Sequence, residues 1–250
     1  MTSIYNYQIK GSNRTFGNRK YDNLTVRGSY VNEGDITTNS TEIFGSASIN
    51  GNLTSKYLLL RGSMRLKGDL ICPSIEIPGS AQINGKLVTK NLFLKGTLHV
   101  REDIKASKFC FRGSANTDKR ILIDNNLTGR GSVRSDKDII AKNIDIIGSL
   151  GSSESIKADN EIIIEGKVKA ENIESESFYL LLSGESEIHG KLEAEEIRID
   201  LSEKAKKRSF LKVKEIICKK SLEIDYVKAD KVKCPNAKFG PNCRIGVIKK

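Results

Sequence analysis

The chain has 250 residues with a formal net charge of +11, five cysteines, two histidines and no tryptophan. This length fits one or two domains, no apolar run is long enough for a membrane-spanning helix, and the start MTSIYNYQIK lacks the apolar core of a secretory signal. An odd number of cysteines without CxxC spacing argues against a disulfide framework and predicts a reducing, cytoplasmic location.

The strongest pattern is a glycine that recurs every 17 residues, at positions 11, 28, 45, 62, 79, 96 and 113. The series continues at Gly131, Gly148, Gly166 and Gly184, with spacings of 17 or 18 residues. Such a fixed period is the signature of a repeat architecture. Each repeat therefore predicts one structural unit that stacks on the next.

Within each repeat, apolar or small residues occur in three pairs, and the members of a pair are two residues apart. In the copy GSAQINGKLVTKNLFLK the pairs are Ala81 and Ile83, Leu87 and Thr89, and Leu92 and Leu94. A spacing of two is the periodicity of a β-strand, and the glycines suit the corners between strands. The pattern predicts an all-β fold, a right-handed parallel β-helix with a triangular coil of about 17 residues.

Three segments follow one another along the chain. Residues 1–10 form a short segment that leads into the first coil, residues 11–201 form regular β-helix coils, and residues 202–250 form a basic corner loop followed by the last coils. Between residues 150 and 184 two coil registers fit the sequence equally well. The first coil places the polar residues Asn13, Thr15 and Arg19 at inward positions, which predicts a poorly packed or capping coil.

Equivalent positions of neighbouring coils define the predicted core. Residues at these positions should stack in columns, and a carboxylate placed at Ile83 should unfold or fray the helix. The core ladder is predicted to contain Ile49, Leu66, Ile83, Val100, Leu53, Leu70, Leu87 and Ile104.

The 17-residue coil, exemplified by GSAQINGKLVTKNLFLKG, resembles that of the bactofilins, the polymer-forming cytoskeletal proteins of bacteria. The tail VKADKVKCPNAKFGPNCRIGVIKK resembles the end of the longer, Firmicutes-type members. The resemblance implies filaments that assemble end to end without nucleotide and support cell-envelope, cell-shape or motility-apparatus assembly. It also implies a paralogous bactofilin, envelope-machinery proteins and the inner face of the membrane as candidate partners.

The physics of an open β-helix favours assembly independently of that resemblance. Its ends present unpaired strand edges above an uncovered core, and the sequence shows no amphipathic cap. Like ends meeting would give two-fold contacts, and unlike ends would give a polar filament. The candidate end contacts are Tyr5, Tyr7, Ile9, Phe239, Ile245 and Val247.

Candidates for chemistry are few, so we predict no catalytic residue, metal site or cofactor. His99 and His189 lie about five coils apart, too far for one metal site, and no nucleophile elbow or phosphate loop occurs. Cys72 occupies an inward position, whereas Cys110 alternates outward. An acidic cluster at residues 185–196 is interpreted as a solvated face, because short regular coils leave no cleft.

Charge is distributed in bands along the chain. Residues 1–150 carry 22 basic and 13 acidic side chains, residues 151–200 carry 5 and 13, and residues 201–250 carry 15 and 5. Bands of opposite sign could join neighbouring copies side by side, with a salt-dependent strength. A basic loop is the candidate patch for an anionic partner or membrane surface, and it contains Lys204, Lys206, Lys207 and Arg208.

The sequence therefore predicts a non-enzymatic, self-assembling scaffold whose main partner is the same chain, with no nucleic acid expected. Two alternatives remain open. One is a monomeric β-helical binding module or adhesin, and the other is a β-helix acyltransferase or carbohydrate-active enzyme.

Overall fold

The computed structural model describes residues 4–205 and 208–249, with side chains from Asn6 onward. These residues form strands and turns, and no helix occurs among them. The paired strands run parallel, and each residue faces its equivalent about 17 residues later, which gives a β-solenoid of about 14 turns. The predicted all-β, parallel β-helix of about 17 residues per coil is confirmed.

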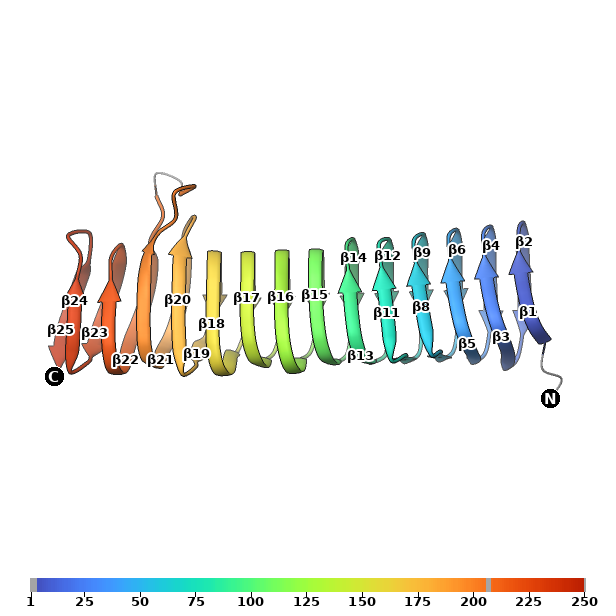
Figure 1. Ribbon diagram of the computed structural model, residues 1–250, viewed down its shortest axis with the longest axis horizontal. Helices are drawn as coiled ribbons and strands as arrows, with labels where there is room; N and C mark the ends of the chain where they lie inside the picture. Colours follow the sequence, from blue (N-terminus) through green and yellow to red (C-terminus); the bar gives the residue numbers. More distant parts are fainter. Residues whose placement is uncertain (1–3, 206–207, 250) are drawn as a thin grey trace. The chain divides into compact units, whose positions relative to one another are not determined.

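The chain divides into two compact units, Met1–Asp124 and Asn125–Lys250. The basic loop and the last coils, residues 202–250, belong to the second unit together with the coils before them. The strands of the first unit run from blue to green in Figure 1, coil beside coil. They are β1 Ile4–Ile9, β2 Ser12–Phe16, β3 Arg19–Val26, β4 Ser29–Glu33, β5 Ile36–Ile43, β6 Ser46–Ile49, β7 Leu53–Thr54, β8 Tyr57–Leu60, β9 Ser63–Leu66, β10 Leu70–Ile71, β11 Ser74–Ile77, β12 Ser80–Ile83, β13 Leu87–Leu94, β14 Thr97–Val100 and β15 Ile104–Thr117.

Strand β16, Ile121–Ser135, contains the boundary between the units. The second unit continues from yellow-green to red in Figure 1, and the described residues on both sides of its gap, 202–205 and 208–210, extend away from the neighbouring coils. Its strands are β17 Ile139–Ser152, β18 Ser155–Ala170, β19 Asn172–Glu174, β20 Ser177–Leu182, β21 Ser186–Leu201, β22 Leu211–Ile224, β23 Val227–Lys233, β24 Asn236–Phe239 and β25 Arg244–Lys249.

The core consists of columns of inward side chains, as the repeat predicts. Alternation along β12 and β14 buries every second residue. Burying this apolar surface contributes roughly 25 cal/mol for each Å² removed from water. All eight residues predicted for the core ladder are fully buried: Ile49, Leu66, Ile83, Val100, Leu53, Leu70, Leu87 and Ile104.

The glycine column forms one corner, where successive backbones approach too closely for a side chain. A Cβ at Gly79 would lie 2.1 Å from the carbonyl oxygen of Gly62. That carbonyl accepts a hydrogen bond from the backbone N–H of Ser80 at 3.0 Å. Glycine is therefore required here by the close approach of two coils.

A column of asparagine and aspartate side chains forms the second corner. The side-chain oxygen of Asp35 accepts the backbone N–H of Asn52 at 2.7 Å, and that of Asn52 accepts the N–H of Asp69 at 2.8 Å. Asp69 continues the column by accepting the N–H of Lys86 at 2.8 Å. Turn N–H groups that lack a strand partner are satisfied in this way.

The third corner carries small residues whose side chains donate to the carbonyl two residues later. Ser55 Oγ donates to Tyr57 at 2.7 Å, and Thr89 Oγ1 donates to Asn91 at 3.1 Å. Cys72 Sγ makes the equivalent contact with Ser74 at 3.0 Å. Pairing at these three residues removes the cost of burying their polar groups, whereas the buried Ser175 hydroxyl at the same corner of the second unit has no hydrogen-bond partner among the described residues.

The second unit contains the register that the sequence leaves ambiguous. Gly148 pairs with Gly166, and Ile156 pairs with Ile173, so Gly166 begins a new coil. The pairing of β17 with β18 shifts by one residue between Ala141 and Asn143. Insertions that lengthen the period to 18 are therefore absorbed at corners by bulges.

Candidate functional site

The last coil has open strand edges among the described residues. Strand β24 pairs only with β22, and β25 pairs only with β23. The opposite edges of β24 and β25 face no strand in the described part of the chain. Such an edge is a template for another strand.

Two inward columns of the second unit end on exposed apolar side chains. Phe239 stacks on the buried Ile224 and is 37% exposed, and Ile248 stacks on the buried Val232 and is 53% exposed. Both line a groove of about 860 Å³ beside the last coil. The solenoid core is therefore open to another apolar surface at this end.

The structure places the predicted end contacts of the tail in two different columns. Ile245 pairs with the buried Ala229 and is half-buried, as an inward residue of the last coil should be. Val247 instead pairs with Lys231 and is 51% exposed, so it lies outside the inward columns, and its role as an end contact stays a prediction. The chain turns a corner between Ile245 and Ile248, so the inward residues are three apart rather than two.

The first coil is polar and aromatic inside. The ring of Tyr7 stacks on that of Tyr21 with centroids 5.0 Å apart, and Asn13 donates to the Tyr7 hydroxyl. Thr15 Oγ1 and the Tyr30 hydroxyl lie 2.8 Å apart, and burial raises the pKa of Tyr30. The predicted polar character of this coil is observed. Hydrogen bonds within the coil pair its polar side chains, so this end differs from an open end lined by apolar residues.

Two further end contacts predicted at this coil differ in placement. Ile9 is only 3% exposed, because it pairs with Val26 inside the first unit. The side chain of Tyr5 lies outside the described residues. Tyr7 therefore remains the described aromatic candidate for a contact at this end.

The basic loop is described only in part. Lys204 Nζ lies 3.3 Å from Glu165 Oε1, and Arg208 is exposed. The predictions for Lys206 and Lys207 fall outside the described residues. The described cations of this loop thus include one that is already paired within the chain.

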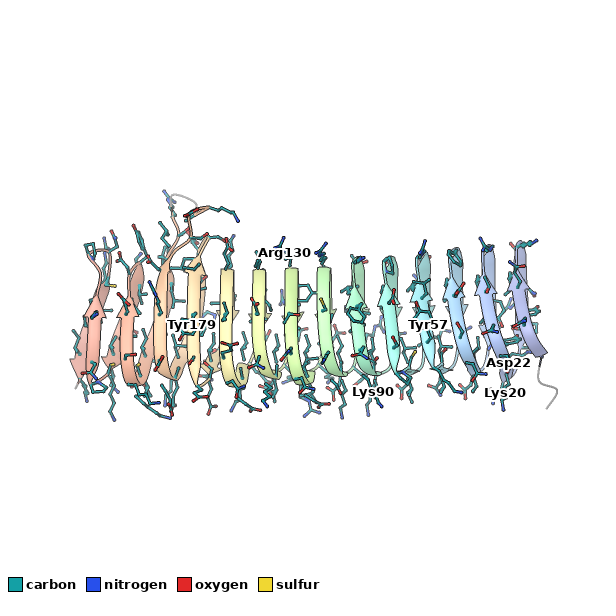
Figure 2. All side chains as sticks on the ribbon, in the orientation of Figure 1. Lys20, Asp22, Tyr57, Lys90, Arg130 and Tyr179 are labelled. Atoms are coloured by element: carbon teal, nitrogen blue, oxygen red, sulfur yellow. The ribbon has the colours of Figure 1, made fainter. Side chains whose placement is uncertain are left out.

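Charged side chains gather along the edges of each unit (Figure 2). In the first unit Lys20, Asp22 and Lys90 project from one edge, and Tyr57 lies on the neighbouring face. In the second unit Arg130 projects at the glycine corner, whereas Tyr179 lies on the face formed by β20. Charged side chains are therefore arranged in columns along each unit, in addition to the bands of net charge along the sequence.

The cysteines do not form a metal or disulfide site in the described structure. Burial raises the pKa of Cys72 to about 11, and burial with the neighbouring thiol of Cys234 raises the pKa of Cys218 to about 11. Cys110 is exposed, as its outward position predicts. No cluster of three or more metal-ligating side chains occurs among the described residues.

The histidines lie beside single carboxylates. His99 Nε2 lies 3.6 Å from Asp118, and His189 Nδ1 lies 3.6 Å from Glu187. An ion pair at such an exposed site contributes little. Among the hydrogen bonds of the described residues, neither histidine contacts a nucleophilic side chain.

Sequence reasoning missed Ile248 and the column structure of the charges in the second unit. The alternation in the tail would have identified Ile248 as an inward residue only if the corner between Ile245 and Ile248 had been predicted. One charged column contains Glu174, Glu193 and Lys233, and the numbers of residues between them are not multiples of 17. Insertions between these residues hide the columns from a fixed-period search.

Comparisons of the chain with family models, curated proteins and solved structures give no match. No helix of the described residues is long and apolar enough to cross a membrane.

Proposed function

We propose that this chain is a non-enzymatic scaffold protein that polymerises by stacking its solenoid ends, without nucleotide, as the resemblance to bactofilins implies. The observation that carries the proposal is the exposure of Phe239 and Ile248 at the end of two otherwise buried columns. Exposed apolar side chains above an open strand edge favour a second copy, which would continue both the core and the hydrogen bonding.

The two described ends favour different strengths of contact. The last coil offers exposed apolar side chains, whereas hydrogen bonds among Tyr7, Asn13, Thr15 and Tyr30 already satisfy polar groups of the first coil. A contact that includes the last coil should bury more apolar surface and be the stronger one. Cytoskeletal support of the bacterial cell envelope is the role that such a polymer would serve.

The test replaces the exposed apolar residues of the last coil in the full chain. We expect the Phe239→Asp/Ile248→Asp variant to remain folded but to lose long assemblies, because charge at the end opposes stacking. The matched control is Ile71→Asp/Phe93→Asp, whose residues are 46% and 47% exposed on the sides of the first unit. Sedimentation velocity and negative-stain microscopy report assembly, and circular dichroism reports folding.

Wild-type chain and the control should form filaments that lengthen with concentration. Monodisperse wild-type protein at every concentration and salt would contradict the proposal. Equal assembly by the end variant and the control would show that the last coil is not the contact.

A further inference from the structure

One lateral face of the second unit carries charge in columns that cross seven coils. We call it the charged face; it consists of the outward side chains beside the buried Ile156, Ile173, Leu192, Ile216 and Val232. The register of β17 to β25 defines its middle column. From coil to coil this column contains Ile140, Lys157, Glu174, Glu193, Ile217, Lys233 and Lys249.

Two flanking columns complete the charged face. On one side Lys191 pairs with Glu215, which pairs with Lys231. The column on the other side consists of the residues that come directly after the buried corner residues. Its members are Asp159, Glu176, Glu195 and Lys219. Acidic residues therefore dominate the two coils of Glu174 and Glu193, the coil of Ile217 carries one charge of each sign, and lysines dominate the coils of Lys233 and Lys249.

The acidic half is hollowed. A groove of about 460 Å³ runs between the middle and flanking columns, over the small corner residues Ala158 and Ser175, and Lys157 and Lys219 line it together with the carboxylates. Because the side chains at that corner are small, the longer carboxylate side chains on both sides of it form the two walls of the groove. A row of lysine side chains from another molecule would fit between such walls by shape and by charge.

Ion pairs within the chain show that the two signs already meet on this face. Lys219 lies 3.0 Å from Glu193, and Lys157 lies 2.9 Å from Glu174. In contrast, neither Glu176 nor Lys233 forms an ion pair within the described residues. Lys220 also lies 2.6 Å from Glu195, and Lys231 lies 2.5 Å from Glu215. A second molecule would therefore meet Lys233 without an ion pair and would share the carboxylates that lysines of the same chain already contact.

We propose that the charged face docks onto the charged face of a second copy of this chain. The two copies would be related by a two-fold axis that runs parallel to the strands, in the contact plane and between the coils of Glu193 and Ile217. This axis reverses the order of coils in the second copy. It also places each column opposite the same column of the second copy. The register then sets Glu174 against Lys233 of the second copy. It also sets Lys191 against Glu215 of the second copy and Glu195 against Lys219 of the second copy.

The symmetry makes each of these contacts occur twice. One like-charged contact is also created, between Lys157 and Lys249 of the second copy, but Lys157 is already bonded to Glu174. The charges match with each column opposite itself, because the acidic coils come before the lysine coils along the chain and the reversed second copy sets one group against the other. Charge complementarity therefore selects a second copy as the occupant and fixes its antiparallel direction.

The size of the contact predicts its strength. Six coils at about 4.8 Å each make a strip about 29 Å long, and a strip one short strand wide is smaller than the roughly 800 Å² per partner of a standard interface. Free molecules should thus pair weakly and only at low salt. Chains already stacked end to end repeat the contact and gain avidity, although the pairing itself does not depend on stacking.

Charge reversal tests the pairing in the full chain. The background is Phe239→Asp/Ile248→Asp, so that lateral pairing is measured separately from stacking. We expect Glu174→Lys and Lys233→Glu each to weaken dimerisation at about 50 mM salt by roughly tenfold, and Glu174→Lys/Lys233→Glu together to restore it. Sedimentation equilibrium measures the association, and the matched controls are Glu76→Lys and Lys90→Glu in the first unit.

Rescue by the double variant would support contact between copies, because about three coils separate the two residues within one chain, roughly 14 Å. Unchanged dimerisation in both single variants, or a double variant weaker than either, would overturn the proposal. A wild-type chain that forms no filaments but keeps this salt-dependent pairing would instead count against the proposed end stacking alone.

Discussion

The two units contain the same kind of core but differ at their corners. In the first unit Leu53, Leu70, Leu87 and Ile104 follow one another at a constant spacing of 17 residues. In the second unit the pairing of β21 with β22 shifts between Ile188 and Lys191 and again between Ala194 and Glu196. The inward residues nevertheless remain buried on both sides of each shift. The insertions in the second unit therefore leave its inward columns intact.

The largest expected effect tests whether both units obey the same core rule. Ile83→Asp in the first unit and Ile164→Asp in the second both place a carboxylate in a fully buried column. We expect each to destabilise the protein by more than about 4 kcal/mol, because no partner for the charge is present. Chemical denaturation measures the loss, and Ile71→Asp at an exposed site is the control. A variant with unchanged stability would show that its column does not support the fold.

The next prediction separates the glycine corners of the two units. A Cβ at Gly79 would meet a backbone carbonyl at 2.1 Å, whereas a Cβ at Gly184 would meet only the flexible side chain of Lys167 at 2.3 Å. We expect Gly79→Ala to cost about 2–3 kcal/mol and Gly184→Ala less than about 1 kcal/mol, because Lys167 can move aside. Melting temperatures compare the two, and equal costs would contradict the difference in corner packing.

Most of the fold could be predicted from the sequence, because glycine spacing and inward pairs repeat without interruption up to residue 113. The corner column of Asn18, Asp35, Asn52 and Asp69 was not predicted, although its members are 17 residues apart, because its hydrogen bonds between coils depend on side-chain placement. The site was less predictable. Insertions shift the charged columns, and Ile248 was not predicted, because a corner separates it from Ile245.

A smaller effect compares two corner aspartates in acid. Burial raises the pKa of Asp103, but hydrogen bonds from the side chain and backbone of Arg120 outweigh it and hold the pKa below its usual value. Its contribution is therefore present above about pH 4 and is lost as the pH falls through the folded-state pKa. Asp103→Asn should cost about 1–3 kcal/mol at pH 7 and almost nothing near pH 2.

Asp138 in the second unit is the comparison, because its side chain accepts the backbone N–H of Ser155 at 3.2 Å without an arginine among its hydrogen bonds and ion pairs in the described residues. We expect Asp138→Asn to have a smaller effect at pH 7. Thermal melts at both pH values measure the difference, and a pH-independent cost for Asp103→Asn would contradict the role of its charge.

The smallest effect concerns thiol reactivity and leaves stability unchanged. Cys110 is exposed, whereas Cys72 and Cys218 are buried and have pKa values raised to about 11. A thiol reagent at pH 8 should therefore modify Cys110 at least about a hundredfold faster than Cys72 or Cys218, since only a small fraction of those thiols is ionised and neither is accessible. Mass spectrometry of time points gives the rates. Rapid labelling of Cys72 would show that the first unit opens locally.

Electron cryo-microscopy of wild-type assemblies tests end-to-end stacking most directly. The account predicts filaments with a layer line near 4.8 Å along their axis, continuous across the junction between molecules, and with the Phe239 and Ile248 side chains buried at a junction. Particles that never exceed one molecule in length, or filaments whose junctions leave both side chains in solvent, would contradict it.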